Sequence, residues 1–257
     1  VLPTDVLGKN YFIMAYKSDG SYLNSTQVSG SSTPSQFAIV ATQDNTSISI
    51  IPSAPTKYNN LNTQNIVLNR GETYLVQANI KPTLLNPDLT GSEIKSDKPI
   101  AVFAGHQRTK LPINPDLTSR DILIEQMPPI DVWGKNAFVV PYKQVPNASP
   151  LGTDIFRVLS ANDNTEIFIN GVLTAVINRG EYYESEVNSA KIITSSSPVL
   201  VAQFKKTSQD QNNVQTISDP FMMLIPPKEQ FLKSYRVINT QAMQYDDNFG
   251  RFDKVYD

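Results

Sequence analysis

The residues of this chain that could carry out acid–base or metal chemistry are few and scattered. Among its 257 residues there is a single histidine, His106, and cysteine is absent. A metal site normally gathers several histidine, cysteine or carboxylate ligands, and a serine or cysteine nucleophile needs a base beside it. His106 accompanies no Gly-x-Ser-x-Gly motif. We therefore predict a structural or surface role for it.

Acidic residues recur in pairs, which raises the alternatives of glycosidase chemistry and calcium binding. Glu72 and Glu181 lie in identical Asn-Arg-Gly-Glu segments, and Asp44 and Asp163 each precede an asparagine. Glycosidases need two carboxyl groups about 5–10 Å apart, whereas calcium loops alternate oxygen ligands densely. Duplicated residues in matching turns are more simply explained by turn geometry. The sequence therefore favours hairpin turns and predicts no catalytic residue, no cofactor and no metal.

One segment occurs three times in the chain. Residues 2–10 read LPTDVLGKN, residues 127–136 read MPPIDVWGKN, and residues 222–233 read MMLIPPKEQFLK. Further blocks recur in the same order, and the shift between matching residues falls from 126 (Gly8 to Gly134) to 99 (Pro99 to Pro198). Ordered self-similarity of this kind indicates an internal repeat.

Short apolar runs bounded by Gly, Pro, Asn and Asp dominate both copies, and such runs are typical of strands. Repeat units of about 100–125 residues have the size of one β-sandwich each. The sequence predicts an all-β fold of tandem antiparallel β-sandwich repeats with little helix. We place the first repeat at 1–120, the second at 121–218 and the start of a truncated third at 219–257. The acidic and aromatic stretch 245–253 could bind a cation or a carbohydrate, but we interpret it as an incomplete strand–loop segment of that third copy.

The first copy is longer than the second in three intervals, at 18–36, 52–64 and 79–91. Blocks that both copies keep must serve the scaffold, whereas segments that one copy alone carries are freer to serve recognition. Polar loops with tyrosines on a rigid sandwich are similar to loop-based binding surfaces. The alternative is a set of tolerated insertions, since long surface loops cost little stability. The candidate partner-binding residues are Tyr22, Asn24, Tyr58, Asn59, Asn86 and Asp88.

Composition limits the classes of partner. The 22 basic and 24 acidic residues give a formal net charge of −2, so there is no electrostatic reason to expect a nucleic acid. No apolar run approaches the roughly 18–20 residues of a membrane helix, and we expect no direct membrane insertion. A chain without cysteine fits a cytosolic protein or a bacterial surface protein. Because it begins with Val1 and the third copy stops at Asp257, we interpret it as a fragment of a longer protein.

Several blocks carry a resemblance to a known family. They are MPPIDVWGKNAFVVPY, FRVLSANDNTEIFINGV, NRGETYLVQA, SDKPIAVFAGH, DILIEQMPP and DPFMMLIPP. In this order they closely resemble the N-terminal domain of the IgGFc-binding protein family, from Leu2 to about Tyr235. That domain occurs in a mucus-associated animal protein and in many secreted bacterial surface proteins. The resemblance implies an extracellular, non-enzymatic binding or adhesion module.

One departure from the family bears on the source and the partner. The animal members carry cysteines around the stretch that corresponds to 107–120, and this chain has none there. The resemblance therefore implies an adhesion or binding module of a larger bacterial cell-surface protein, secreted or at the cell surface, with no residue assigned to immunoglobulin binding. Its partner would be a protein or glycan on a surface. The alternative is a structural spacer or filament subunit, whose partners are neighbouring repeats or subunits of the same assembly.

Overall fold

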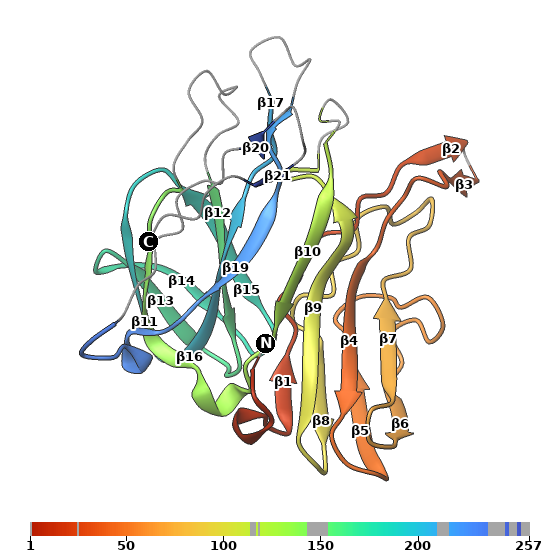
Figure 1. Cartoon of the computed structure of the whole chain (residues 1–257), viewed down its shortest axis with the longest axis horizontal. Coiled ribbons are helices and arrows are strands. Elements are labelled where there is room, and N and C mark those ends of the chain that lie inside the picture. Colours follow the sequence, from red (N-terminus) through yellow and green to blue (C-terminus); the bar gives the residue numbers. More distant parts are fainter. Residues whose placement is uncertain are drawn as a thin grey trace.

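The computed structural model describes residues 2–24, 26–113, 117, 119–142, 154–209, 216–235, 245–246 and 251–252. Within these residues the regular secondary structure is almost entirely strand, apart from three single-turn 3-10 helices, and the paired strands are antiparallel (Figure 1). The predicted all-β antiparallel fold with little helix is confirmed. Among the described residues no helix is long and apolar enough to cross a membrane.

The elements follow the chain in this order: η1 (Thr4–Val6), β1 (Asn10–Phe12), β2 (Tyr22–Asn24), β3 (Gln27–Val28), β4 (Ser35–Ala41), β5 (Thr46–Ile51), β6 (Gln64–Leu68), β7 (Thr73–Gln77), β8 (Glu93–Ser96), β9 (Ile100–Thr109), β10 (Asp121–Gln126), η2 (Ile130–Val132), β11 (Gly134–Val139), β12 (Asp154–Ser160), β13 (Thr165–Ile169), β14 (Val172–Ile177), β15 (Tyr182–Val187), β16 (Lys191–Lys205), β17 (Ser208–Gln209), β18 (Thr216–Ser218), β19 (Phe221–Ile225), η3 (Lys228–Gln230), β20 (Tyr245–Asp246) and β21 (Arg251–Phe252). We call β1–β10 the first half and β11–β19 the second half.

The first half contains two four-stranded sheets, ordered β1-β8-β5-β6 and β10-β9-β4-β7. Strand β4 alternates buried and partly exposed residues along its whole length, as a strand with one face on a core must. Its inward residues Phe37, Ile39 and Ala41 belong to one apolar cluster with Ile48 and Ile50 of β5, which lies in the other sheet. The two sheets therefore form a sandwich around a shared core.

In the second half, one strand joins what are two separate sheets in the first. Strand β16 runs through fifteen residues. Its first part pairs with β11 and β13, and its second part pairs with β12 and β19. In the first half the chain breaks between β8 and β9 at the corresponding place, near Pro99. The result in the second half is a single seven-stranded sheet instead of two four-stranded ones.

Apart from the short hairpins β2·β3 and β17·β18, the strand pairings of the two halves nevertheless correspond one to one. The pairs β1·β8, β5·β8, β5·β6, β4·β9, β4·β7 and β9·β10 have the counterparts β11·β16, β13·β16, β13·β14, β12·β16, β12·β15 and β16·β19. Strand β10 pairs with β9 and β19 pairs with β16, so each half is completed by the strand that precedes the next proline pair. The repeat bounds 1–120, 121–218 and 219–257 stay a prediction.

The segment that the sequence repeats three times forms a 3-10 turn after a proline at each occurrence. Each later occurrence packs on the half before it. A Cβ on Gly8 would lie 2.4 Å from Cβ of Pro129, and one on Gly134 would lie 2.3 Å from Cβ of Pro227. These distances are far below van der Waals contact, so both positions need glycine because another chain segment lies against the backbone there.

The aromatic residue that follows each later turn also packs on the preceding half. Trp133 contacts the ring of Phe12 at 6.2 Å, and Phe231 contacts the ring of Phe138 at 6.1 Å between centroids. Trp133 is 8% exposed, so it is a core residue at the junction between the halves. Phe231, its counterpart, remains largely exposed.

The two halves share a core. All seven residues of β12 are buried, because one face of the strand packs inside the second half and the other packs on the first. Phe156 and Val158 lie in the apolar cluster of the second half, whereas Ile155 and Leu159 join the cluster of the first. Arg157 lies between these two on the face toward the first half, and it is the largest fully buried side chain.

Candidate binding site

The three segments that only the first copy carries meet at one place. A hollow of about 280 Å³ is lined by residues of all three, together with the ends of β7 and β9: Val28, Ser29, Gly30, Ser32, Pro34, Lys57, Gln77, Ala78, Asn79, Ile80 and Gln107. We call it the loop hollow. Ladder-like contacts tie the segments to the scaffold here, since Lys57 N–H donates to the carbonyl of Gln77 and Asn79 N–H donates to that of Pro55.

The first segment contains the short hairpin of β2 and β3, which extends from the upper right of the molecule in Figure 1. Tyr22 opposes Val28 in this hairpin, and Asn24 opposes Gln27. The Asn24 side-chain oxygen accepts hydrogen bonds from both the backbone N–H and the hydroxyl of Thr26, so much of its bonding capacity shapes the turn. Asn24 is exposed.

The second segment presents the most exposed aromatic ring of the described residues. Tyr58 is 81% exposed, and the ammonium group of Lys57 lies 5.6 Å from its ring centroid. Asn59 is exposed beside it, and its backbone N–H donates to the hydroxyl of Thr56. Tyr58 and Asn59 therefore lie at the tip of a short turn that is held by main-chain bonds, which leaves both side chains facing solvent.

The third segment turns toward the second half instead. The Asn86 side-chain amide donates to the carbonyl of Ser18 at 2.7 Å and holds the first and third segments together. Asp88 forms an ion pair with Arg157 at 2.9 Å and accepts a hydrogen bond from the hydroxyl of Tyr182 at 3.2 Å. Burial by itself would raise the pKa of Asp88, but the Arg157 charge and two hydrogen bonds from Thr90 outweigh it and lower the pKa. Asp88 thus belongs to the contact between the halves.

Arg157 is the centre of that contact. Its guanidinium group pairs with Glu184 at 2.7 Å and donates to the carbonyl of Ala15 and the hydroxyl of Thr90, both at 2.8 Å. It also stacks over three aromatic rings, those of Tyr16, Tyr182 and Phe204, at 4.4–5.5 Å. Stacking and forked hydrogen bonding suit arginine to buried contacts. This cluster was missed from the sequence. Arg157 is the one charged residue in the apolar run FRVLS, and the first copy has Ala38 at that position; this difference could have pointed to it.

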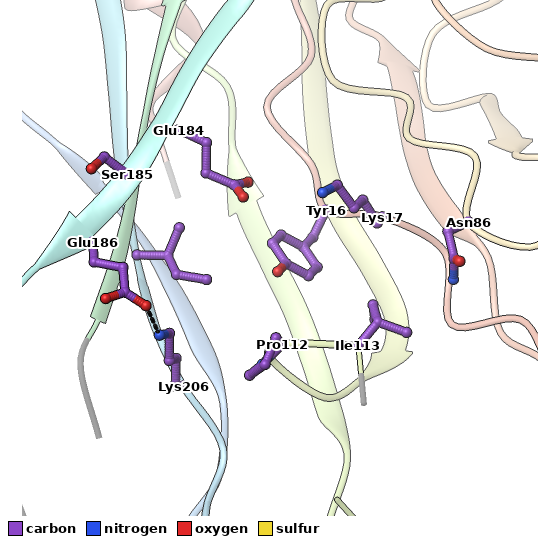
Figure 2. Close-up of a pocket in the computed structure, with 10 residues that line it drawn as sticks. Tyr16, Lys17, Asn86, Pro112, Ile113, Glu184, Ser185, Glu186 and Lys206 are labelled. Carbon is purple, nitrogen blue, oxygen red and sulfur yellow. Dashed lines mark hydrogen bonds and ion pairs between the residues drawn. The ribbon is translucent and has the colours of Figure 1, made fainter. Parts of the chain in front are cut away.

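A cleft of about 670 Å³ opens beside this cluster, between the two halves. Figure 2 shows Tyr16, Lys17, Asn86, Pro112 and Ile113 of the first half facing Glu184, Ser185, Glu186 and Lys206 of the second. Its charges balance one another: Lys206 pairs with Glu186 at 2.5 Å, and Glu184 pairs with Arg157. Burial raises the pKa of Tyr16, which keeps its hydroxyl protonated at neutral pH. The cleft therefore offers mixed polar and apolar surface without a strong field of either sign.

His106 is fully buried in β9, which agrees with the predicted structural role. Its Nδ1 accepts the backbone N–H of Arg108 at 3.0 Å. Burial lowers the pKa of His106 to about 3, so the imidazole is neutral at physiological pH. The chain has no second histidine, and the described residues contain no group of three potential metal ligands.

The duplicated acidic residues lie in turns, as their pattern predicted. Asn45 and Asn164 have φ of 51° and 52°, and the following Asn-Arg-Gly-Glu turns place glycine at φ near +80°. Glu72 accepts the backbone N–H of Asn69 at 2.7 Å, and Glu181 accepts that of Asn178 at 2.8 Å. Each carboxylate thus closes its own turn. This use explains the duplication without catalysis.

The comparisons with known proteins agree with the resemblance found in the sequence. The model of the family described as IgGFc binding protein matches residues 1–250. No curated protein and no solved structure matches the chain.

Proposed function

Because the chain belongs to the IgGFc binding protein family, we propose that it is a non-enzymatic, extracellular binding module that holds a protein partner at the loop hollow. The finer proposal is adhesion as part of a larger bacterial surface protein. We further propose that two sandwich repeats in tandem, with bounds near residues 120 and 218, carry this surface. The proposed contacts are Tyr22, Asn24, Tyr58 and Asn59, which lie on the first two segments beside the hollow; Lys57 is the residue of the second segment that lines it.

One observation carries the proposal: the three segments that the first copy alone carries converge on one hollow. Because they meet, the three segments form one continuous surface rather than three separate loops. The exposed ring of Tyr58, with Lys57 beside it, is suited to anchor a partner. A tyrosine side chain buries much apolar area on binding at low entropic cost, and its hydroxyl remains able to form hydrogen bonds. Asn86 and Asp88 are not proposed contacts, since their side chains are bound within the protein and turn toward the second half.

The experiment compares matched tyrosine variants. The family name makes the Fc fragment of immunoglobulin G the first probe, and an array of surface glycans the second. We expect Tyr58→Ala to weaken binding to the recognised probe at least tenfold, whereas Tyr235→Ala, an exposed tyrosine elsewhere, leaves it unchanged. Thermal melts of both variants should match the parent. Equal affinity of the parent and Tyr58→Ala would refute the loop hollow as the binding surface.

A second candidate, a stiff spacer in a surface assembly, is favoured by the core that the two halves share. A spacer must resist bending at its joints, and a joint filled by Arg157, Tyr16 and Phe204 is packed rather than hinged. Small-angle scattering tests this candidate. A single rigid envelope supports the spacer, and a distribution of angles between the halves contradicts it.

A further inference from the structure

The joint between the halves uses two surfaces, and each has an exposed counterpart on the other half. The second half contributes the outer face of β12, β15, β16 and β19, which we call its sheet face. The first half contributes the chain from Phe12 to Tyr16 together with the start of β8, which we call its edge segment. The one-to-one strand pairing places an equivalent sheet face on the first half and an equivalent edge segment on the second.

The sheet face of the first half is apolar and open. On the second half, Arg157 pairs across strands with Glu184 and Ala202; on the first, Ala38 pairs with Leu75 and Phe103 at the same places. Leu75 is 52% exposed and Ile124 is 56% exposed. The apolar residues of this face are Ala38, Val40, Leu75, Ala101, Phe103, Ile122 and Ile124. In the second half the equivalent face is buried against a neighbouring sandwich.

The edge segment of the second half is also apolar and open. Phe138 pairs with Ile192 there, as Phe12 pairs with Glu93 in the first half. Val140 is 58% exposed and Ile192 is 50% exposed, and Phe138 and Phe231 extend the same patch. The corresponding residues of the first half, Phe12 and Met14, are fully covered by the second half.

Of the four charged groups that form ion pairs across the joint, three have no charged counterpart on the open surfaces; the fourth, Arg179, is matched by the exposed Arg70. The internal joint contains two ion pairs across the halves, Arg157 with Asp88 and Arg179 with Glu93. On the open sheet face Ala38 replaces Arg157. On the open edge segment Ile192 replaces Glu93, and Asp88 lies in a segment that the second copy lacks. A buried charge without its partner is strongly unfavourable. Each open surface therefore fits the other better than it fits either internal one.

We propose that the sheet face of one copy of this chain binds the edge segment of a second copy, with the geometry that joins the two halves. Such a contact is head-to-tail, so each added copy leaves one surface of each kind open for a further copy. Open apolar patches of this kind commonly mark interaction sites. The contact needs neither the loop hollow nor its partner, so this inference stands apart from the proposed function.

The absence of cysteine allows a direct test by cross-linking. Within the joint, Arg179 touches Glu93; the equivalent residues across two copies are Arg70 and Ile192. We expect an equimolar mixture of Arg70→Cys and Ile192→Cys, treated with a short bis-maleimide, to give a covalent dimer. Each variant alone should give at least tenfold less. The control mixture of Arg70→Cys with Val176→Cys, an exposed position on β14, should give no more than the single variants.

A charge placed on the sheet face supplies the second measurement. Ile124→Arg, combined with Arg70→Cys, should reduce the covalent dimer at least tenfold, and its melt should match the parent because Ile124 is exposed. Tyr58→Ala should leave the dimer unchanged, which separates this contact from the loop hollow. Sedimentation of the parent should show an average mass that rises with concentration. A parent that stays monomeric, or a single variant that cross-links to itself as well as the mixture does, would overturn the proposal.

Discussion

Replacement of Arg157 by methionine is the most direct perturbation of the joint between the halves. The substitution keeps much of the side-chain volume and removes the charge. It leaves Asp88, with only 12% of its side chain exposed, without its cation, and it removes the donors to Ala15 and Thr90. Glu184 is more exposed and can be solvated when the arginine is gone. The main loss of stability therefore comes from Asp88, whose buried carboxylate is left without a cation.

The size of the effect follows from these contacts. Removal of one partner of a buried ion pair costs about 3–5 kcal/mol, chiefly through the charge that is left behind. Arg157→Met should therefore lower the free energy of unfolding by about 3–5 kcal/mol. Asp88→Asn removes that stranded charge but leaves Arg157 paired with Glu184, so it should cost about 1–3 kcal/mol. The double variant should be more stable than the sum of the two losses predicts.

Urea unfolding, followed by Trp133 fluorescence and by circular dichroism, measures these free energies. The matched control is Arg70→Met, the equivalent of Arg179 in the first half, which is exposed and makes no ion pair among the described residues. It should change stability by less than about 0.5 kcal/mol. A loss below about 1 kcal/mol for Arg157→Met, or strict additivity in the cycle, would refute the assignment of Arg157 as the buried charge that joins the halves.

Three further outcomes are expected. The free energy of unfolding should fall by about 2 kcal/mol from pH 7 to pH 5 through His106 alone, because the unfolded imidazole takes up a proton near pH 6.5 while burial holds the folded pKa near 3. In urea titrations, the free energy of unfolding of His106→Gln should fall less steeply as the pH is lowered. An unchanged dependence on pH would contradict the buried neutral imidazole. Thermal melts with and without a strong chelator should coincide, since the acidic turns bind backbone N–H groups, and a lower melting temperature in chelator would restore calcium binding to these turns. Gly134→Ala should destabilise the protein by more than about 1 kcal/mol through the clash with Pro227. Gly30→Ala should not change stability in the same urea assay, because a Cβ added at Gly30 meets no atom within 4 Å. Equal effects of the two substitutions would mean that Pro227 moves aside freely.

The sequence was most informative where backbone geometry limits the choice of residue. Asn45 and Asn164 precede strands at positive φ, and the Asn-Arg-Gly-Glu segments close their turns through their own glutamates, so local chemistry alone predicted these hairpins. The structural role predicted for His106 followed in the same way from the lack of partner residues in the sequence, and the side chain is buried. Propensity and spacing are adequate guides to such local features.

Features that depend on the contact between the halves were beyond this reasoning. The apolar run from Tyr11 to Tyr16 has the pattern of a single strand, yet β1 ends at Phe12. Beyond it the backbone bonds to side chains: Met14 N–H donates to the sulfur of Met127, and Ala15 N–H donates to the hydroxyl of Thr90. These partners lie 75 or more residues away in the chain. No local sequence pattern shows that the second half will cover the segment from Tyr11 to Tyr16.

The burial of β12 on both faces also governs how the protein comes apart. Ile155 and Leu159 complete the core of the first half, while Phe156 and Val158 complete that of the second. Neither half can unfold without exposing core residues of the other. Their unfolding is therefore coupled, and the two halves behave as one cooperative unit. A pulling force along the chain would meet that coupled unit as a single mechanical element. Two sandwiches hung on a loose linker would instead yield one after the other.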